Sequence, residues 1–273
     1  MPPLSDLENL FSLRLLPGVY PLTEAHQQAG QQPDNLCGPY WVALLLRSHG
    51  FAVTAEQVAQ IAGTVLPVGD PSLWLPAGAP SRQNYSLTLP TTASLKDAGT
   101  SAMGLQRAVQ KITSGAYALL PVQAAWTGDR LLEVLRLCQD QPHWQVVPLA
   151  NLRTGHFWGS RLAVSAALGY LNGASIHSPP PADWDVGHFL VLAGLVAGQT
   201  RSLTWVCDTY PQFGWQGYHL QPAEAVAAAL NRGDGWGGGI LLFSAAEHQG
   251  EMEQQLSAKG FSLELWDNGS PQP

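Results

Sequence analysis

The sequence predicts an α+β fold in which N-terminal helices pack on a late antiparallel β-sheet. Apolar residues at helical spacing dominate the first half of the chain, and short apolar runs bounded by glycines follow in the second half. With 273 residues, 45% of them hydrophobic, the chain can bury a sizeable core. We therefore expect a single domain over residues 1–266, helical to about 140 and sheet-forming from about 141, and a flexible tail at 267–273.

The helices are predicted from their ends as well as from their spacing. Pro39 suits the first position of a helix that ends at Gly50, and most residues between them are apolar. Thr54 can cap a second helix while Gln57 reaches back to it, and Gly63 ends that helix. Further helical patterns lie at about 101–113, 128–139 and 160–171, and after Pro222.

The strands are predicted from short apolar runs next to turn residues. Residues 187–196 are partly β-branched and bounded by glycines, which is typical of a strand. A turn at 198–199 joins this strand to 202–208 as an antiparallel hairpin. The prolines between 64 and 99 forbid long regular structure, so this segment is expected to be an irregular surface excursion. Shorter strands are expected at 146–150 and 239–243.

The composition limits the partners of the chain. Only 12% of residues are charged, the net charge is -7, and no lysine- or arginine-rich block is present, so we expect no nucleic-acid partner. No apolar run reaches the roughly 18 residues of a membrane-spanning helix, so we expect no membrane partner. Residues 1–6 lack the basic and apolar regions of a secretory signal, which favours a cytoplasmic protein.

Three cysteines are too few and too scattered for a disulfide framework, so we expect free thiols. Cys138 and Cys207 fall on apolar faces of a predicted helix and a predicted strand and are expected in the core. Cys37 directly precedes the first predicted helix, where free N–H groups and the positive end of the helix dipole favour a thiolate. Cys37 is therefore the candidate nucleophile.

The neighbours of Cys37 suit acyl chemistry. Gly38 lets the backbone come close to a bound group, and the backbone N–H of Cys37 can donate to an oxyanion. Gln31 lies six residues before the thiol, and its side-chain amide is the right kind of donor for the other half of an oxyanion hole.

A thiolate also needs a proton acceptor, and His188 has the best context among the eight histidines because it opens an apolar strand. Asp208 closes the partner strand of the predicted hairpin, and antiparallel pairing brings the two strand ends together. Asp208 then orients His188 while the other ring nitrogen faces Cys37. Asp183 and Asp185 lie close to His188 in sequence and are alternatives for this orienting role.

These residues carry a family resemblance. Its segments are Gln31 followed six residues later by Cys37-Gly38-Pro39, then Gly187-His188-Phe189-Leu190-Val191-Leu192, then Val206-Cys207-Asp208-Thr209-Tyr210. In this order they resemble the papain-like cysteine peptidase superfamily, nearest to the bacteriocin-processing, double-glycine leader peptidases and related bacterial members. The resemblance implies a papain-like fold and assigns the oxyanion hole, nucleophile, base and orienting group to Gln31, Cys37, His188 and Asp208.

The resulting expectation is a thiol hydrolase or acyltransferase that acts on an amide or thioester bond of a peptide or small amide through an acyl-Cys37 intermediate. The expected substrate-binding residues are Gly38, Gly187 and Trp184. Tryptophans in or next to loops can line an aromatic groove or fill the core, and they are Trp74, Trp126, Trp158, Trp184, Trp215 and Trp236. No cofactor is implied, and paired metal-ligand spacings are missing from the sequence.

Each candidate also has a plainer interpretation. Cys37 alone can be an inert buried residue, His188 can bond a backbone carbonyl at a strand end, and Asp208 can cap the turn that follows it. The alternative function is a non-catalytic peptide- or small-molecule-binding module that retains the papain-like fold, with a thiol of ordinary reactivity.

Overall fold

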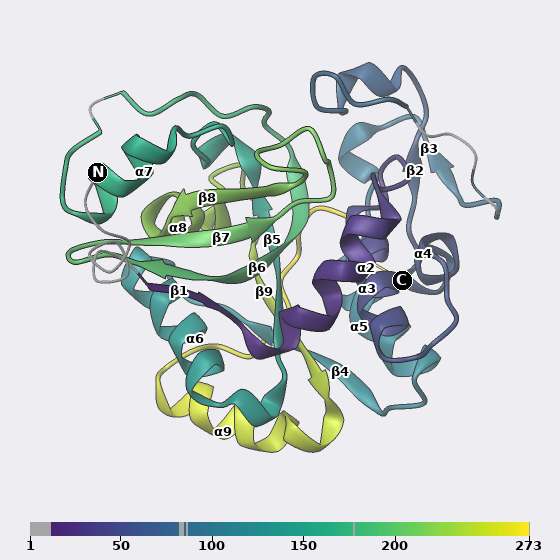
Figure 1. Ribbon diagram of the computed structural model, residues 1–273. Helices are drawn as coiled ribbons and strands as arrows, with labels where there is room; N and C mark the ends of the chain where they lie inside the picture. The colour runs from purple at the N-terminus through teal and green to yellow at the C-terminus, as the bar shows by residue number, and fades with distance from the viewer. Residues whose placement is uncertain (1–11, 82–84, 86, 177, 273) are drawn as a thin grey trace.

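The computed structural model describes residues 12–81, 85, 87–176 and 178–272, so the expectation for residues 1–6 lies outside the described residues. The α+β class is confirmed (Figure 1). Within the described residues the main sheet has seven strands, all paired antiparallel, and β1 (Ser12–Leu15) pairs with β6. The order of the others is β4 (Tyr117–Val122), β9 (Gly239–Ala245), β5 (Val147–Arg153), β6 (Gly187–Ala197), β7 (Ser202–Cys207) and β8 (Tyr218–Pro222).

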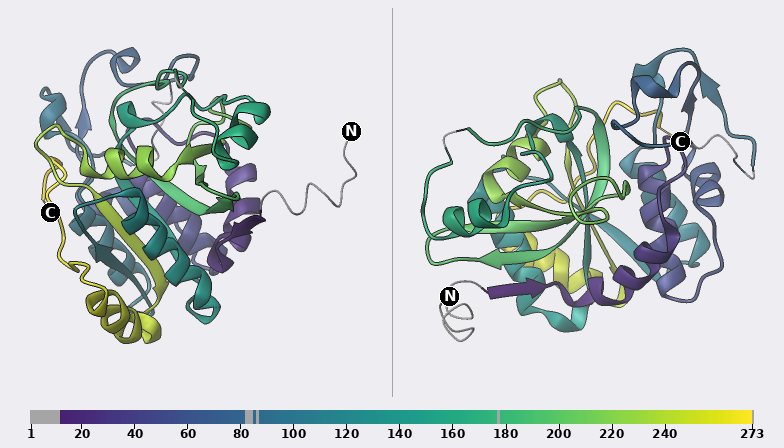
Figure 2. Two further views of the ribbon diagram at one scale, coloured as in Figure 1. Left: turned by 90° about the vertical axis from the view of Figure 1, so that its left-hand side faces the viewer. Right: turned by 45° about the horizontal axis from the view of Figure 1, so that its top comes forward.

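Helices lie on opposite sides of this sheet. α3 (Cys37–Ser48) packs against β6, α5 (Ala102–Ile112) packs against β4, and α8 (Ala223–Asn231) packs against β5. The remaining helices are α2 (Tyr20–Ala29), α4 (Ala55–Ala62), α6 (Gly128–Asp140), α7 (Val164–Leu171) and α9 (Gln249–Ala258). Figures 1 and 2 show α2–α5 together on one side, and α7 and α8 on the other. Over the described ranges, none of these helices is long and apolar enough to cross a membrane.

One hydrophobic cluster joins the helices to the sheet. It contains Trp41 of α3 and Phe243 of β9, both fully buried, together with apolar residues of α5, β5 and β6. Burying a large apolar side chain contributes about 1.5–3 kcal/mol. The contact between α3 and β6 holds the first residue of the helix beside the start of the strand, and this fixes the position of Cys37 relative to His188.

The predicted caps are found in α4, whereas α3 starts earlier than predicted. α3 begins at Cys37, two residues before the predicted start at Pro39. Thr54 and Gln57 form the predicted capping box of α4, and Gly63 ends that helix in the left-handed conformation with φ 73°. Local sequence therefore determines the ends of these helices.

β6 and β7 form the predicted hairpin. Ala197 lies opposite Ser202, so the loop spans residues 198–201, and the register shifts between Leu192 and Gly194. β6 pairs with β5 over its first half and with β1 over its second half. Because β7 also pairs with β6 from Val191 onward, the second half of β6 lies between β1 and β7 inside the sheet.

The sequence patterns do not predict β1, β4, β8, α2 or α9. β4 lies before residue 141, so the expected division into a helical part and a later sheet part is wrong there. β4 contains Pro121 in an apolar run without alternation, and it lies at the edge of the sheet, where proline is tolerated. The segment 64–99 is largely irregular, as predicted, and holds the short parallel strands β2 (Leu66–Pro67) and β3 (Thr91–Thr92).

The start of the C-terminal segment is packed, which differs from the flexible tail expected at 267–273. Asn268 is 7% exposed and donates to the Thr100 carbonyl at 3.0 Å. The Asp267 carbonyl accepts the N–H of Gly237 at 2.8 Å. Composition alone does not reveal such contacts, because they depend on residues far away in the chain.

Candidate active site

Cys37 is the first residue of α3, and its side chain is partly exposed. Because it opens the helix, its backbone N–H has no intrahelical acceptor. The preceding loop is tied to the segment after β7, since the N–H of Gln32 donates to the Thr209 carbonyl at 3.2 Å. The helix start is therefore held next to the end of the β6–β7 hairpin.

The thiol of Cys37 meets the ring of His188, the second residue of β6. A side-chain hydrogen bond joins them, and the N–H groups of Phe189 and Gly38 also donate to the sulfur. Burial favours the neutral thiol and would raise the pKa of Cys37. The hydrogen bond and charge of His188, with the two N–H groups, outweigh burial and lower that pKa below its usual value. The surroundings of Cys37 therefore favour a thiolate.

Asp208, the first residue after β7, holds the other side of the His188 ring. Its Oδ1 lies 3.3 Å from Nε2 of His188 and accepts the N–H of Tyr210 at 3.1 Å. The hydroxyl of Thr209 lies 3.3 Å from the same Nε2. Since Nε2 faces these groups, Nδ1 is the ring nitrogen left for the thiol. The side chains of His188 and Asp208 are each 2% exposed, so their attraction is only weakly screened by solvent.

In the pair formed by His188 and Asp208, electrostatic attraction and hydrogen bonding outweigh the effect of burial on each pKa. Burial would lower the pKa of His188, but the charge and hydrogen bond of Asp208, and then those of Cys37, raise it to about 10. Burial would raise the pKa of Asp208, but the charge and hydrogen bond of His188, followed by the electrostatic attraction of His219 and the N–H of Tyr210, lower it. These shifts favour an imidazolium at His188 between a carboxylate at Asp208 and a thiolate at Cys37.

The two alternative acids are engaged elsewhere. Asp185 is exposed and pairs with Arg153, with Oδ1 at 2.7 Å from Nε of the arginine. Asp183 accepts the N–H of Ser160 at 2.7 Å. Asp208 is therefore the acid that bonds His188.

Trp184 lies against the His188 ring, with the two ring centroids 5.1 Å apart at an angle of 69°. It also contacts Tyr210 and Phe213, at centroid distances of 5.3 and 5.5 Å. It does not line the cleft that contains Cys37. In this structure the Trp184 ring covers His188, and a role in substrate binding stays a prediction.

Gln31 does not line the cleft either, although its side chain was a candidate oxyanion donor. Its Nε2 donates to the Pro80 carbonyl at 2.8 Å, because the segment 64–99 passes over it. Of the two glycines, Gly187 lines the cleft and Gly38 does not. A Cβ on Gly38 would lie 2.9 Å from Cδ1 of Leu105, so this glycine serves close packing of α3, and its contact with substrate stays a prediction.

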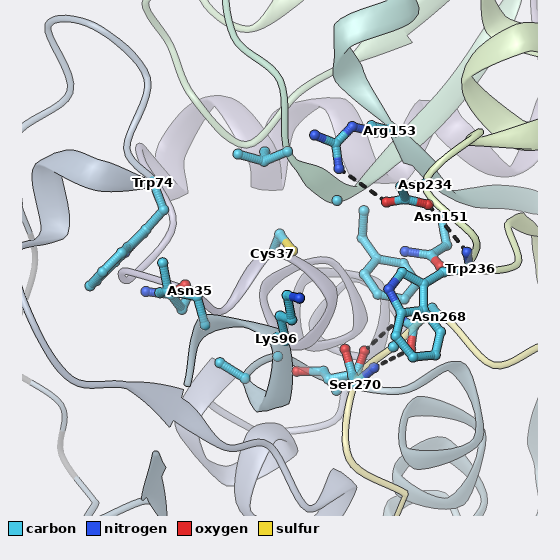
Figure 3. A pocket seen from close by; sticks show the side chains of 18 of the residues that line it. Asn35, Cys37, Trp74, Lys96, Asn151, Arg153, Asp234, Trp236, Asn268 and Ser270 are labelled. Carbon is cyan, nitrogen blue, oxygen red and sulfur yellow. Dashed lines mark hydrogen bonds and ion pairs between the residues drawn. The ribbon is translucent and has the colours of Figure 1, made fainter. Parts of the chain in front are cut away.

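A cleft of about 450 Å³ opens at Cys37. Figure 3 shows the thiol in the middle, with Trp74 and Asn35 on one side and Arg153, Asp234 and Trp236 on the other. Two of the loop tryptophans proposed for a groove, Trp74 and Trp236, therefore line it. The walls come from the segment 64–99, the end of β5, the loop after α8 and the C-terminal segment.

Ion pairs form one wall of the cleft. Asp234 accepts two bonds from Arg232, at 3.1 and 2.8 Å, and one from Arg153 at 3.0 Å. Arg232 is 5% exposed and has φ 62°, a conformation that costs energy for a residue other than glycine. Together with Asp185, which pairs with Arg153, this group contains two arginines and two aspartates, so its formal charges cancel. Lys96 on the opposite side is exposed and forms no ion pair within the described ranges.

Sequence reasoning missed this wall and the residue behind Asp208. Arg232 and Asp234 lie two residues apart in the loop after α8, but Arg153 comes from β5, and no sequence pattern links it to them. His219 lies on the unpredicted strand β8, with Nε2 at 4.0 Å from Oδ2 of Asp208. The alternation of Tyr218, His219, Leu220 and Gln221 is the one local signal for that strand.

Comparison with known proteins gives a family but no described relative. A search of curated proteins found no match, and no solved structure matches the chain. A family model described as "Family of unknown function (DUF6885)" matches residues 16–267, which is most of the chain. The chain belongs to this family.

Proposed function

We propose that this protein is a papain-like cysteine hydrolase or acyltransferase that acts on an amide or thioester bond of a peptide or small amide. The observation that carries the proposal is the hydrogen-bonded series Cys37, His188 and Asp208 at a helix start that opens into a cleft. A nucleophile bonded to a base, with the base bonded to an acid, is the arrangement that nucleophilic catalysis requires. A papain-like fold is part of the same proposal, supported by the order of these segments.

The reaction follows from the protonation states. The thiolate of Cys37 attacks the substrate carbonyl carbon, and the C–O π electrons move onto oxygen to give a tetrahedral oxyanion. As the oxyanion collapses, the bond to the leaving group breaks, and His188 gives its proton to that group. The resulting acyl-Cys37 is then attacked by water or an amine, whose proton passes to His188, and the thiolate leaves. Asp208 keeps the ring oriented and stabilises its charge in both halves.

The oxyanion needs two donors. The backbone N–H of Cys37 lies at the free end of α3 and supplies the first. Gln31 supplies the second when its amide exchanges the Pro80 carbonyl for the substrate oxygen. In the described structure this amide donates its hydrogen bond to the Pro80 carbonyl. Substrate binding therefore includes a shift that breaks this bond.

The cleft suits an uncharged or weakly charged acyl chain. Its ion pairs are internally balanced, and Trp74 and Trp236 present aromatic surface on its two sides. A cytoplasmic location, the absence of a nucleic-acid partner and the lack of a cofactor stay predictions from the sequence.

The test is intact-protein mass spectrometry after brief exposure to peptide thioesters and peptide p-nitrophenyl esters of varied sequence. We expect a mass increase equal to the acyl group, its absence in Cys37→Ala, and its presence in Cys138→Ala, which removes a buried thiol remote from the cleft. Wild-type protein that acquires no acyl group, with a thiol of ordinary reactivity, would instead support the non-catalytic binding module.

A further inference from the structure

His219 lies behind the triad, and the mechanism above gives it no step. Its side chain is 3% exposed, and it is the second residue of β8. Oδ1 of Asp208 carries the bonds to His188 and Tyr210, whereas Oδ2 faces Nε2 of His219 at 4.0 Å. A cavity of only about 10 Å³, close to the space of one water molecule, borders both side chains. The Asp208 charge is thus shielded from bulk water and depends on the groups around it.

Gln221 determines which nitrogen of His219 carries the proton. Its Nε2 lies 3.0 Å from Nδ1 of His219 and 2.7 Å from the Trp158 carbonyl, and it donates to both. The N–H of Trp158 donates to Oε1 of Gln221 at 2.8 Å, which fixes the orientation of the amide. Nδ1 of His219 is therefore an acceptor, and the ring proton lies on Nε2, on the side of Asp208.

The surroundings keep His219 neutral. The titratable groups that face it are Asp208 at the end of β7, Asp183 in the loop before β6, and His188 on β6. Burial, the largest effect, lowers the pKa of His219; the two aspartates raise it, and His188 lowers it again, with a net decrease. Phe157 closes another side at a ring-centroid distance of 5.9 Å. A neutral ring offers Asp208 an N–H without placing a second cation beside the His188 imidazolium.

We infer that His219, held by Gln221, is a positioning residue that directs its Nε2–H toward Asp208 and keeps this carboxylate ionised and turned toward His188. The inference rests on the proposed function of the triad. Without the donor, ionised Asp208 is less stable in its buried site and holds the His188 proton less strongly. Cys37 then shifts from thiolate toward thiol, although His219 touches neither the thiol nor the cleft.

The test measures the rate of Cys37 alkylation by iodoacetamide against pH. His219→Met removes the donor at similar volume, His219→Gln keeps an amide N–H near the position of Nε2, and His49→Met is the matched control. His49 bonds Tyr117 next to the far end of α3. We expect the rate of His219→Met near pH 6 to fall about tenfold, equal to a rise of about one unit in the Cys37 pKa. The rate near pH 10 stays unchanged, and His219→Gln recovers most of the loss.

The results distinguish failure of the proposed function from failure of the role inferred for His219. A wild-type thiol with an ordinary pKa of about 8.5 contradicts the proposed function. An activated wild-type thiol with an unchanged profile in His219→Met contradicts only the inference. If near-ultraviolet circular dichroism shows that His219→Met does not fold, Gln221→Leu is tested in its place. This variant removes the hydrogen bond that fixes the His219 tautomer and keeps His219 itself. A fall in its rate near pH 6 supports the inference, and an unchanged rate overturns it.

Discussion

Nε2 of His188 lies 3.3 Å from Oδ1 of Asp208, and the two residues stand at the open ends of one β-hairpin. The hairpin joins positions that are 20 residues apart in the chain. The start of α3 adds the thiol of Cys37 on the other side of the ring. The three segments thus surround the ring of His188. If Asp208 keeps this ring protonated, the thiol of Cys37 is favoured as a thiolate.

Removing the Asp208 charge should deactivate the thiol. In Asp208→Asn the His188 proton loses its main electrostatic support, so the pKa of His188 falls and that of Cys37 rises. We expect iodoacetamide alkylation near pH 6 to slow by about tenfold or more. Asp185→Asn is the matched control, because Asp185 is 55% exposed and pairs with Arg153. Equal rates for the two variants would contradict the role of Asp208.

Gln31 should matter for acylation and not for alkylation. Acyl transfer develops charge on a carbonyl oxygen, whereas displacement of iodide by the thiolate forms no oxyanion. We expect Gln31→Ala to slow acylation by peptide p-nitrophenyl esters about 10²-fold while iodoacetamide alkylation is unchanged. Gln28→Ala, on the exposed side of α2, is the control. An acylation rate in Gln31→Ala that equals the wild-type rate would remove this residue from the oxyanion hole.

Asp234 should stabilise the fold in a pH-dependent way. The Arg232 hydrogen bonds, opposed by burial and helped by the charges of Arg232 and Arg153, lower the pKa of Asp234 to about 2. A depressed carboxyl pKa contributes stability that is complete above the unfolded value of about 3.9 and is lost as pH falls toward 2. We expect Asp234→Asn to lower the free energy of unfolding by about 2 kcal/mol near pH 7.

The measurement for Asp234 is urea unfolding across acidic and neutral pH. The difference between wild type and Asp234→Asn should shrink as pH falls from about 4 to about 2. Asp185→Asn removes an exposed pair with the same Arg153 and should cost about 0–1 kcal/mol. A difference for Asp234→Asn that is constant with pH would show that ionisation of Asp234 does not stabilise the fold.

Lys96 should affect charged reagents selectively. It is the exposed cation on one side of the cleft, while the arginines opposite are paired with aspartates. We expect Lys96→Glu to slow alkylation by anionic iodoacetate about twofold to fivefold at low salt, with little effect on neutral iodoacetamide. Lys111→Glu, at an exposed position of α5, gives the same change in net charge away from the cleft. Equal effects from both variants would mean that only net charge matters.

Local patterns were enough to predict that Cys37, His188 and Asp208 lie together. Cys37 precedes an apolar helix, and His188 and Asp208 end two strands joined by a short turn, so spacing alone brings the last two together. The choice of Asp208 over Asp185 needed the structure. Asp185 is nearer in sequence, but the structure turns it toward Arg153.

Residues that depend on tertiary contacts could not be predicted. Gln31 bonds Pro80, which lies 49 residues away in an irregular segment. Arg232 takes a left-handed backbone conformation that no propensity favours, and His219 lies on a strand that ends at Pro222, a residue more typical of a helix start. Helix ends and turns are set by neighbouring residues, whereas cleft walls are set by packing between distant segments.

The most direct test of the central claim is the pH dependence of iodoacetamide alkylation at Cys37, followed by peptide mapping in the wild-type protein. Cys138 and Cys207 are buried and serve as internal references. If His188 and Asp208 activate the thiol, Cys37 alkylates rapidly near pH 6 and the midpoint lies well below about 8.5. A midpoint near 8.5, with Cys37 unchanged by His188→Gln, would contradict the account.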